Sequence, residues 1–270
     1  MPVSLDQILA ATRARVASAK SRTDARDLER RTEEHIPRGF RRALQQKAET
    51  GVAVIAELKK ASPSKGVIRP QFDVTRLAIE LESSGAAALS VLTNEEFFQG
   101  SLENLRSASA AVQIPCLRKD FIIDEFQLGE ARASSADAVL LIIAALTQSE
   151  LTDLFHRARE LGLDVLCEVH DEDELSMALD AGCDTIGVNT RDLRTFTVNP
   201  HTALRLADKI PRDIFRVAES GIRSGEEIAR LRAAGYQGFL IGESLMRVDE
   251  PGDMLRNLLR ESAALSPSAF

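Results

Sequence analysis

From Val52 onward, a short apolar segment alternates with a segment of helical periodicity, and this unit occurs eight times. The apolar segments are residues 52–57, 86–92, 114–119, 137–143, 164–169, 184–189, 214–219 and 238–242. The helical segments are residues 73–84, 101–111, 124–134, 148–161, 171–181, 201–208, 224–234 and 251–262. Eight units of about 25 residues are typical of a parallel barrel with a helix after each strand. The predicted fold class is therefore α/β, a (β/α)8 TIM barrel.

A doubly wound open sheet is the alternative fold, but no Gly-x-Gly-x-x-Gly follows the first strand. Glycines end four of the helices just before the next strand, at Gly85, Gly162, Gly182 and Gly235. Helix N-caps are expected at Ser149, Asp171 and Ser224, and Glu227 completes a capping box with the last of these.

Some fifty residues precede the first strand, and they predict helices over residues 4–21 and 38–49, with a helix or a loop over the charged residues 23–34. Nearby acidic residues suggest that the arginines of this region lie on solvated helix faces. They are Arg26, Arg30, Arg31, Arg38, Arg41 and Arg42. We expect one domain over residues 1–270, with residues 1–50 as an N-terminal helical extension.

The first strand ends in Glu57 and Lys59, two opposite charges on the same face because strand side chains alternate. The loop that follows, from about Lys60 to Gln71, is longer than the usual ~2–6 residues of a strand-to-helix connection. A solvated ion pair at a strand end would explain this segment if it stood alone. A binding loop is the alternative, and the other strand ends favour it.

Four more strands end in polar side chains that are expected to point to the same face as the inward apolar residues of the strand. They are Lys119, Glu168, Asn189 and Glu219. The site of such a barrel lies at the carboxyl ends of its strands. Buried charges are costly unless they are paired. We therefore expect these groups, with Glu57 and Lys59, to form a polar catalytic cup with lysine acids and glutamate bases.

Two short loops after the seventh and eighth strands contain Ser220 with Gly221 and Gly242 with Glu243. Loops at these positions often bind phosphate through backbone N–H groups. They predict a phosphorylated small-molecule substrate, although either loop alone could be an ordinary turn.

The composition narrows the class of protein. The net charge is -7, with 28% charged and 44% hydrophobic residues, which favours neither a nucleic-acid partner nor a membrane. The three cysteines have no metal-ligand spacing, and we expect them to be reduced and buried in a cytoplasmic protein. No metal site is expected, because lysines are interspersed among the carboxylates of the strand ends. His170 either faces the site or only begins a helix.

Six motifs in order resemble the indole-3-glycerol phosphate synthase family, over residues 5–259. They are Glu57-Leu-Lys59-Lys-Ala-Ser62-Pro-Ser-Lys-Gly66, Leu117-Arg-Lys119-Asp-Phe121, Cys167-Glu168-Val-His170, Gly187-Val-Asn189-Thr-Arg191-Asp-Leu193, Ala218-Glu219-Ser220-Gly221-Ile222 and Ile241-Gly242-Glu243-Ser-Leu-Met246. The resemblance implies a lyase of tryptophan biosynthesis. It would close, decarboxylate and dehydrate 1-(2-carboxyphenylamino)-1-deoxyribulose 5-phosphate without cofactor or metal. It also implies that residues 1–50 cap the barrel mouth.

The resemblance also implies roles for single residues. Lys119 would be a general acid with Glu168 as its partner, and Lys59 with Glu57 would serve dehydration. Asn189 and Glu219 would bind sugar hydroxyls or hold the network. The remaining roles are substrate binding: Ser62 and Arg191 for the carboxylate, Phe121 and Leu140 for the aromatic ring, and Ser220, Gly221, Gly242 and Glu243 for the phosphate.

Two rival functions remain from the sequence. A phosphoribosylanthranilate isomerase would need a Cys/Asp pair where Glu57, Lys59 and Glu168 stand. A non-catalytic scaffold barrel would not need the charged cup. We expect a monomer or a weak homo-oligomer.

Overall fold

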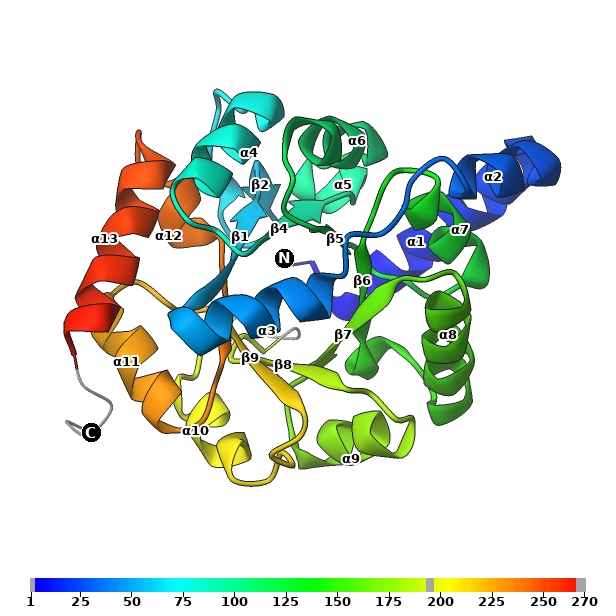
Figure 1. Cartoon of the computed structure of the whole chain (residues 1–270). Coiled ribbons are helices and arrows are strands. Elements are labelled where there is room, and N and C mark those ends of the chain that lie inside the picture. The colour runs from blue at the N-terminus through cyan, green and yellow to red at the C-terminus, as the bar shows by residue number, and fades with distance from the viewer. Residues whose placement is uncertain (1–2, 193–196, 266–270) are drawn as a thin grey trace.

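A closed barrel of eight parallel strands forms the centre of the computed structural model, which describes residues 3–192 and 197–265 (Figure 1). Leu193, the end of one quoted motif, lies outside the described residues. Around the barrel the strand order is β1-β10-β9-β8-β7-β6-β5-β4. The strands are β1 (Ala53–Leu58), β4 (Ala88–Leu92), β5 (Cys116–Lys119), β6 (Ala138–Ile142), β7 (Asp164–Val169), β8 (Thr185–Asn189), β9 (Phe215–Glu219) and β10 (Gly238–Ile241). The predicted barrel fold is confirmed.

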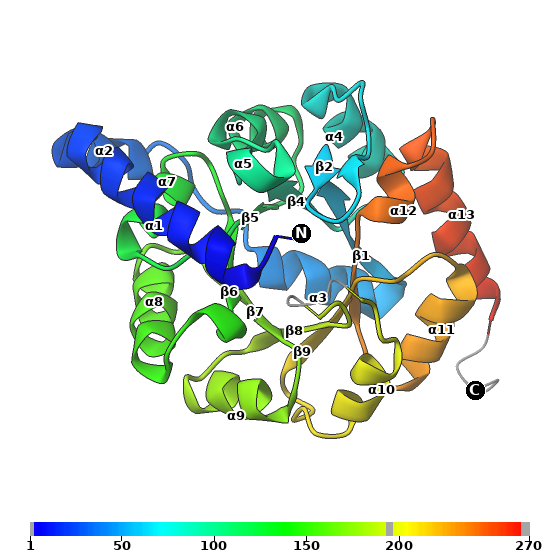
Figure 2. The same ribbon diagram turned by 180° about the vertical axis from the view of Figure 1, so that it is seen from behind.

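A ring of helices surrounds the barrel, one after each strand (Figures 1 and 2). These helices are α4 (Val74–Ser83), α6 (Leu102–Ala111), α7 (Glu125–Arg132), α8 (Gln148–Glu160), α9 (Glu172–Asp180), α10 (His201–Ala207), α11 (Gly225–Ala233) and α13 (Pro251–Ala264). The predicted cap of α8 at Ser149 is wrong, because Thr147 caps this helix and forms the capping box with Glu150. The caps at Asp171 and Ser224 are confirmed.

Several short elements in the loops were not predicted from the sequence. They are the paired strands β2 (Ala61–Ser62) and β3 (Gly66–Val67), the helices α5 (Glu95–Phe98) and α12 (Glu243–Met246), and the 3-10 turn η1 (Ile143–Ala145). All of them follow barrel strands, so they shape the loops at the carboxyl end of the barrel. Segments of two to four residues carry too little periodicity for a sequence pattern to reveal them.

The strands bury both faces, and the two faces belong to different cores. Inward residues such as Ile55, Leu117 and Leu166 fill the lumen, whereas Val54 and Ala56 belong to the core between strands and helices. The side chains at the strand ends follow the same alternation, as expected from the sequence. The inward side chain that comes two residues after each of these lumen residues therefore points toward the barrel mouth.

The N-terminal extension is divided between the two ends of the barrel. It contains α1 (Leu5–Arg22), α2 (Ala25–Thr32) and α3 (Phe40–Thr50). Helix α1 lies on the carboxyl side, where Arg15 pairs with Asp120 just after β5. Helix α3 instead covers the amino ends of the strands, where its buried Phe40 and Leu44 pack into the lumen core (Figure 1). The expectation that all of residues 1–50 cap the mouth thus differs from the structure at α3.

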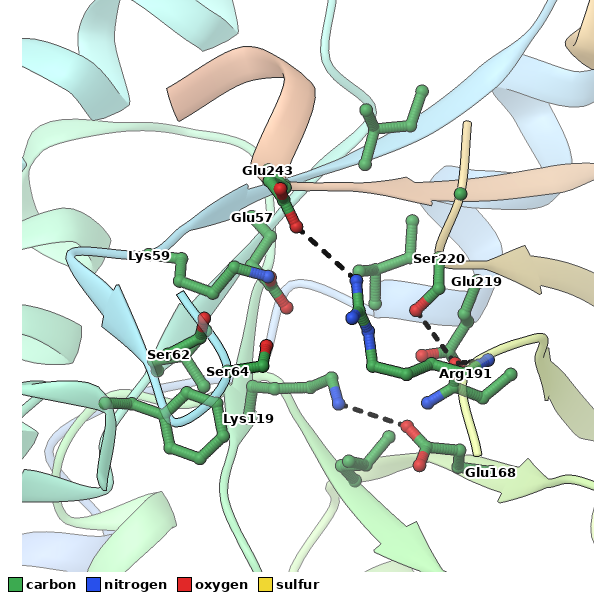
Figure 3. A pocket seen from close by; sticks show the side chains of 18 of the residues that line it. Glu57, Lys59, Ser62, Ser64, Lys119, Glu168, Arg191, Glu219, Ser220 and Glu243 are labelled. Atoms are coloured by element: carbon green, nitrogen blue, oxygen red, sulfur yellow. Dashed lines mark hydrogen bonds and ion pairs between the residues drawn. The ribbon is translucent and has the colours of Figure 1, made fainter. Parts of the chain in front are cut away.

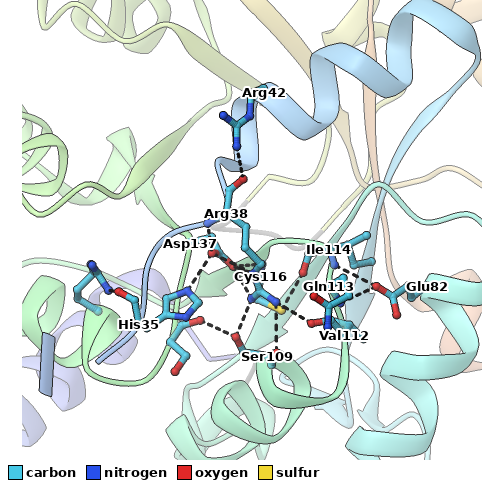
Figure 4. A network of polar contacts seen from close by, with 12 residues as sticks. His35, Arg38, Arg42, Glu82, Ser109, Val112, Gln113, Ile114, Cys116 and Asp137 are labelled. Atoms are coloured by element: carbon cyan, nitrogen blue, oxygen red, sulfur yellow. Dashed lines mark hydrogen bonds and ion pairs between the residues drawn. The ribbon is translucent and has the colours of Figure 1, made fainter. Parts of the chain in front are cut away.

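The amino end also holds a buried ionic network centred on Asp137 (Figure 4). Its carboxylate accepts hydrogen bonds from the Arg38 guanidinium at 2.6 Å, the Arg38 backbone N–H at 2.7 Å and the Cys116 backbone N–H at 2.7 Å. The His35 ring lies 3.0 Å away. Burial would raise the pKa of Asp137, but the hydrogen bonds from His35 and Arg38 lower it. The prediction that Arg38 lies on a solvated face is therefore wrong.

The expectation of three reduced cysteines is also wrong. The structure pairs Cys167 of β7 with Cys183 in a buried disulfide, and only Cys116 is free. Cys183 follows α9, which packs on β7, so the fold brings together two thiols that are 16 residues apart. No helix in the described part of the chain is long and apolar enough to cross a membrane.

Candidate active site

A cavity of about 460 Å³ opens at the carboxyl end of the barrel (Figure 3). All fourteen residues singled out from the sequence line this one cavity. They are Glu57, Lys59, Ser62, Lys119, Phe121, Leu140, Glu168, Asn189, Arg191, Glu219, Ser220, Gly221, Gly242 and Glu243. The barrel brings them together because inward positions at the ends of neighbouring parallel strands meet around one opening.

Two lysine–glutamate pairs form the floor of the cavity. The Lys119 Nζ lies 3.1 Å from Glu168 Oε2, and the Lys59 Nζ lies 2.5 Å from Glu57 Oε1. Lys119 and Glu168 come from β5 and β7, which both flank β6. Figure 3 shows the Lys119 ammonium pointing across the cavity at Glu168. Each pair places a potential proton donor beside a potential acceptor.

The electrostatic environment decides which protonation state each of these side chains favours. Burial would lower the pKa of Lys119, but the carboxylates of Glu168, Glu219 and Glu57 raise it above the ordinary lysine value. Burial would raise the pKa of Glu168, but Lys119 and His170 lower it. Burial and the charge of Glu168 together raise the pKa of Glu219 well above its usual range. The environment of the cup therefore favours the ammonium form of Lys119, the ionised form of Glu168 and the protonated form of Glu219.

Two glycines make room for these carboxylates. A Cβ at Gly187 of β8 would collide with the Glu219 carboxylate, and one at Gly242 would collide with the Glu57 carboxylate. The close approach of backbone to carboxylate is possible only without a side chain at these positions.

The loop after β9 has an unusual backbone. Ser220 and Gly221 both have a left-handed conformation, with φ of 66° and 79°. The Ser220 hydroxyl donates to Asn189 Oδ1 at 2.8 Å, and the same oxygen accepts the Arg191 N–H at 3.0 Å. Asn189 thus ties the end of β8 to this loop. A non-Gly residue in the left-handed region costs free energy and is most often seen at functional sites.

Cationic side chains lie beside the loop after β10. Glu243, the first residue of α12, is 3.4 Å from the Arg191 guanidinium and 2.9 Å from that of Arg247. Burial would raise the pKa of Glu243, but the neighbouring Arg247 and Arg191 lower it. With the first N–H groups of α12, Arg247 makes a region suited to a dianionic phosphate.

The comparisons with known proteins agree with this geometry. The family model for indole-3-glycerol phosphate synthase matches residues 5–258. The chain belongs to the indole-3-glycerol phosphate synthase family. An indole-3-glycerol phosphate synthase of Koribacter versatilis is 60% identical, over 96% of this chain and all of that protein. One of Chlorobium phaeovibrioides is 51% identical over 77% of this chain and 80% of that protein.

The solved structures that resemble the chain support the barrel fold alone. KGPDC from Streptococcus mutans has a TM-score of 0.61 at 10% identity, over 80% of this chain and 99% of that one. Thiamine phosphate pyrophosphorylase from Pyrococcus furiosus has a TM-score of 0.59 at 15% identity, over 79% of this chain and 96% of that one.

As a member of the indole-3-glycerol phosphate synthase family, the chain is an enzyme, a carboxy-lyase of tryptophan biosynthesis that acts on a phosphorylated small molecule. The matched family model and the two relatives named above are indole-3-glycerol phosphate synthases, which favours this activity over that of the isomerase kept as a rival. The predicted family, reaction class and fold are therefore confirmed, while the roles of single residues stay predictions.

The sequence did not single out several residues that line the cavity. Leu5 and Ile8 come from α1, Phe98 from α5, and Arg223 and Arg247 from the loops after β9 and α12. The Phe98 ring lies 6.4 Å from that of Phe121, which enlarges the aromatic wall. The apolar stripe of α1 was visible in the sequence, but nothing local indicated that it would cover the mouth. In the described residues, no group of acidic, histidine or cysteine side chains could hold a metal ion.

Proposed function

We propose that this cavity converts 1-(2-carboxyphenylamino)-1-deoxyribulose 5-phosphate into indole-3-glycerol phosphate, with Lys119 as the acid of ring closure. The ring carbon that bears the carboxylate attacks the ketone carbon, and the ketone oxygen takes the Lys119 proton. Carbon dioxide then leaves from that ring carbon, and its bonding electrons restore the aromatic ring. The ammonium raised in pKa by three carboxylates suits a group that must stay protonated until charge develops on oxygen.

The last step removes water from the closed ring. Lys59, as the acid, would protonate the departing hydroxyl, and Glu57, as the base, would take the proton whose loss completes the indole. These two groups are already paired at 2.5 Å and lie across the cavity from the Lys119 pair (Figure 3). Glu168 would serve as the electrostatic and acid–base partner of Lys119. Asn189 and Glu219 would contact the sugar hydroxyls or hold the network.

The remaining residues would hold the two ends of the substrate apart. Phe121 and Leu140 give the aromatic ring an apolar wall, which favours loss of CO2 from a desolvated carboxylate. Ser62 and Arg191 would bind that carboxylate. The phosphate would lie against backbone N–H groups of Ser220, Gly221, Gly242 and Glu243, so that the ketone falls between the two lysines.

The Lys119–Glu168 pair is the observation that carries this proposal. The test mixes the protein with the substrate, without added metal, and follows the fluorescence of the indole product. The chain contains no Trp that would contribute indole emission. Lys119→Ala should lower turnover by roughly 10²-fold or more. Lys209→Ala, which removes an exposed lysine that pairs with Glu172, is the matched control. A near-normal rate in Lys119→Ala would show that the role of this lysine is wrong.

Two further expectations belong to the same proposal. The enzyme would work in the cytoplasm, and it would be a monomer or a weak homo-oligomer without nucleic-acid partners. Light scattering across a range of protein concentrations tests the second point, and a stable dimer at the lowest concentration would contradict it.

A further inference from the structure

His170 lies immediately behind the cavity, between two carboxylates. It follows β7, and its ring Nδ1 is 2.9 Å from Glu174 Oε2 in the first turn of α9. On the other side, its ring Nε2 is 3.5 Å from Glu168 Oε1. The same Glu174 oxygen accepts the backbone N–H of His170 at 2.8 Å. The ring is therefore held from α9 and directed at the carboxylate that pairs with Lys119.

The facing atoms of His170 and Glu168 are both buried. Within the described residues, Nε2 of His170 and Oε1 of Glu168 are among the few buried side-chain atoms that have no hydrogen-bond partner. Buried polar atoms are nearly always hydrogen-bonded, and these two lie next to each other. A small approach of the two groups would satisfy both atoms with one N–H···O bond.

The chemistry of the two partners fixes the charge of the ring. An ionised carboxylate can only accept hydrogen bonds, so each ring nitrogen of His170 must carry a proton to meet the oxygen it faces. A neutral imidazole has one protonated nitrogen and would direct a lone pair at one of the carboxylates. The arrangement thus favours the imidazolium form.

The charged groups around the ring agree with this reading. Burial would lower the pKa of His170, but the hydrogen bond to Glu174 and the charges of Glu168 and Glu174 raise it, against a smaller opposing effect of Lys119. Glu219 from β9 also lies beside Glu168, and burial and the charge of Glu168 raise the pKa of Glu219, which favours its uncharged form. The net effect keeps positive charge on both sides of Glu168.

We propose that His170, held by Glu174, is a positioning residue that fixes the Glu168 carboxylate toward Lys119 and keeps it ionised during turnover. Oε2 of Glu168 then remains with the lysine, while Oε1 is held from behind. His170 does not line the cavity, so it acts on the reaction through Glu168. The inference rests on the role proposed above for the Lys119–Glu168 pair.

A pH dependence follows, with a definite sign. The imidazolium is present below the pKa of His170 in the folded protein and is lost as the pH rises through that value. Loss of the proton leaves a lone pair facing a carboxylate, which releases Glu168 from its position. Turnover should therefore fall on the alkaline side, at a pH above the ordinary histidine range.

The experiment compares four variants with the wild type, and one of them, Glu168→Gln, tests the partner of His170. His170→Gln keeps an amide donor but removes the charge, and Glu174→Gln keeps an acceptor but removes the charge that raises the pKa of His170. His156→Gln changes an exposed histidine on α8 and is the matched control. For each variant, kcat and KM are measured across pH, and histidine titrations are followed by NMR without substrate.

We expect His170→Gln to lower kcat by about tenfold with little change in KM, less than the effect of removing a proton-transfer group. Its alkaline limb should disappear, and Glu174→Gln should shift that limb to lower pH. The NMR pKa of His170 should lie above the ordinary value and fall in Glu168→Gln. His156→Gln should behave like the wild type.

Either of two results would overturn the proposal. One is a wild-type kcat and an unchanged alkaline limb in His170→Gln. The other is a lower kcat with an unmoved pH profile and an ordinary NMR pKa for His170, which would mean that the residue only supports the fold. The NMR titration needs no turnover, so its outcome is separable from the role of Glu168. Failure of that role would appear as an active Glu168→Gln variant.

Discussion

The two ends of the barrel both bury charged side chains, but they do so in opposite ways. At the amino end, the Asp137 carboxylate meets several donors, and no atom of Asp137, Arg38 or His35 is among the buried atoms without a partner in the described residues (Figure 4). At the carboxyl end, Glu168 Oε1 and Glu219 Oε1 lack such partners (Figure 3). A satisfied network stabilises a fold, whereas an incompletely satisfied one leaves oxygens that still need a partner, which we assign to His170 for Glu168 and to the substrate for Glu219.

The largest expected effect is on stability, at the amino end. Asp137→Asn removes the charge that compensates Arg38 and should lower the free energy of unfolding by about 3 kcal/mol, because the half-buried Arg38 is left without its ion-pair partner. Urea denaturation measures this loss. The kcat of the folded fraction should stay near wild type, because the network lies at the end opposite the cavity. A lower kcat at unchanged stability would break the distinction between the two ends.

The opposite pattern is expected for Glu168→Gln at the carboxyl end. Turnover should fall by roughly 10²-fold, because the partner of Lys119 loses its charge. The free energy of unfolding should change by less than about 1 kcal/mol, because Glu219 is then free to ionise and pair with Lys119. Indole fluorescence gives the rate and urea denaturation the stability. A stability loss as large as that of Asp137→Asn would make the two ends equivalent.

A smaller effect is expected for Glu219→Gln, because the amide resembles the protonated carboxyl that burial and Glu168 favour. Turnover should fall by less than about tenfold, well below the effect of Glu168→Gln. The same fluorescence assay compares the two variants. Equal losses would indicate that Glu219 acts in its ionised form.

The smallest expected effect is the acid sensitivity of the amino end. The pKa of Asp137 in the folded protein is below its usual value. The contribution of the ionised Asp137 carboxylate to the free energy of unfolding is therefore fully present above about pH 4, the ordinary pKa range of an Asp in the unfolded chain. It is lost as the pH falls through the folded-state pKa. The difference in unfolding free energy between the wild type and Asp137→Asn should therefore narrow on acidification, as urea denaturation at several pH values would show. A constant difference would contradict the assignment.

Local patterns were sufficient for most of the fold. Strand and helix segments could be predicted to within a few residues because apolar periodicity and glycine stops are properties of neighbouring residues. Side-chain parity placed Lys119, Glu168 and Glu219 on inward positions for the same reason. Once the barrel was inferred, their convergence followed from the common direction of the strands.

What the sequence by itself determined is the repeating unit, the inward parity of the strand ends and the family. Only the tertiary structure decided that α3 closes the amino end, that Cys167 meets Cys183, that the half-buried Arg38 pairs with Asp137, and that His170 faces Glu168. These contacts depend on how helices pack against strands after the barrel has closed. A short-range pattern carries no information about such partners, since packing and not periodicity selects them.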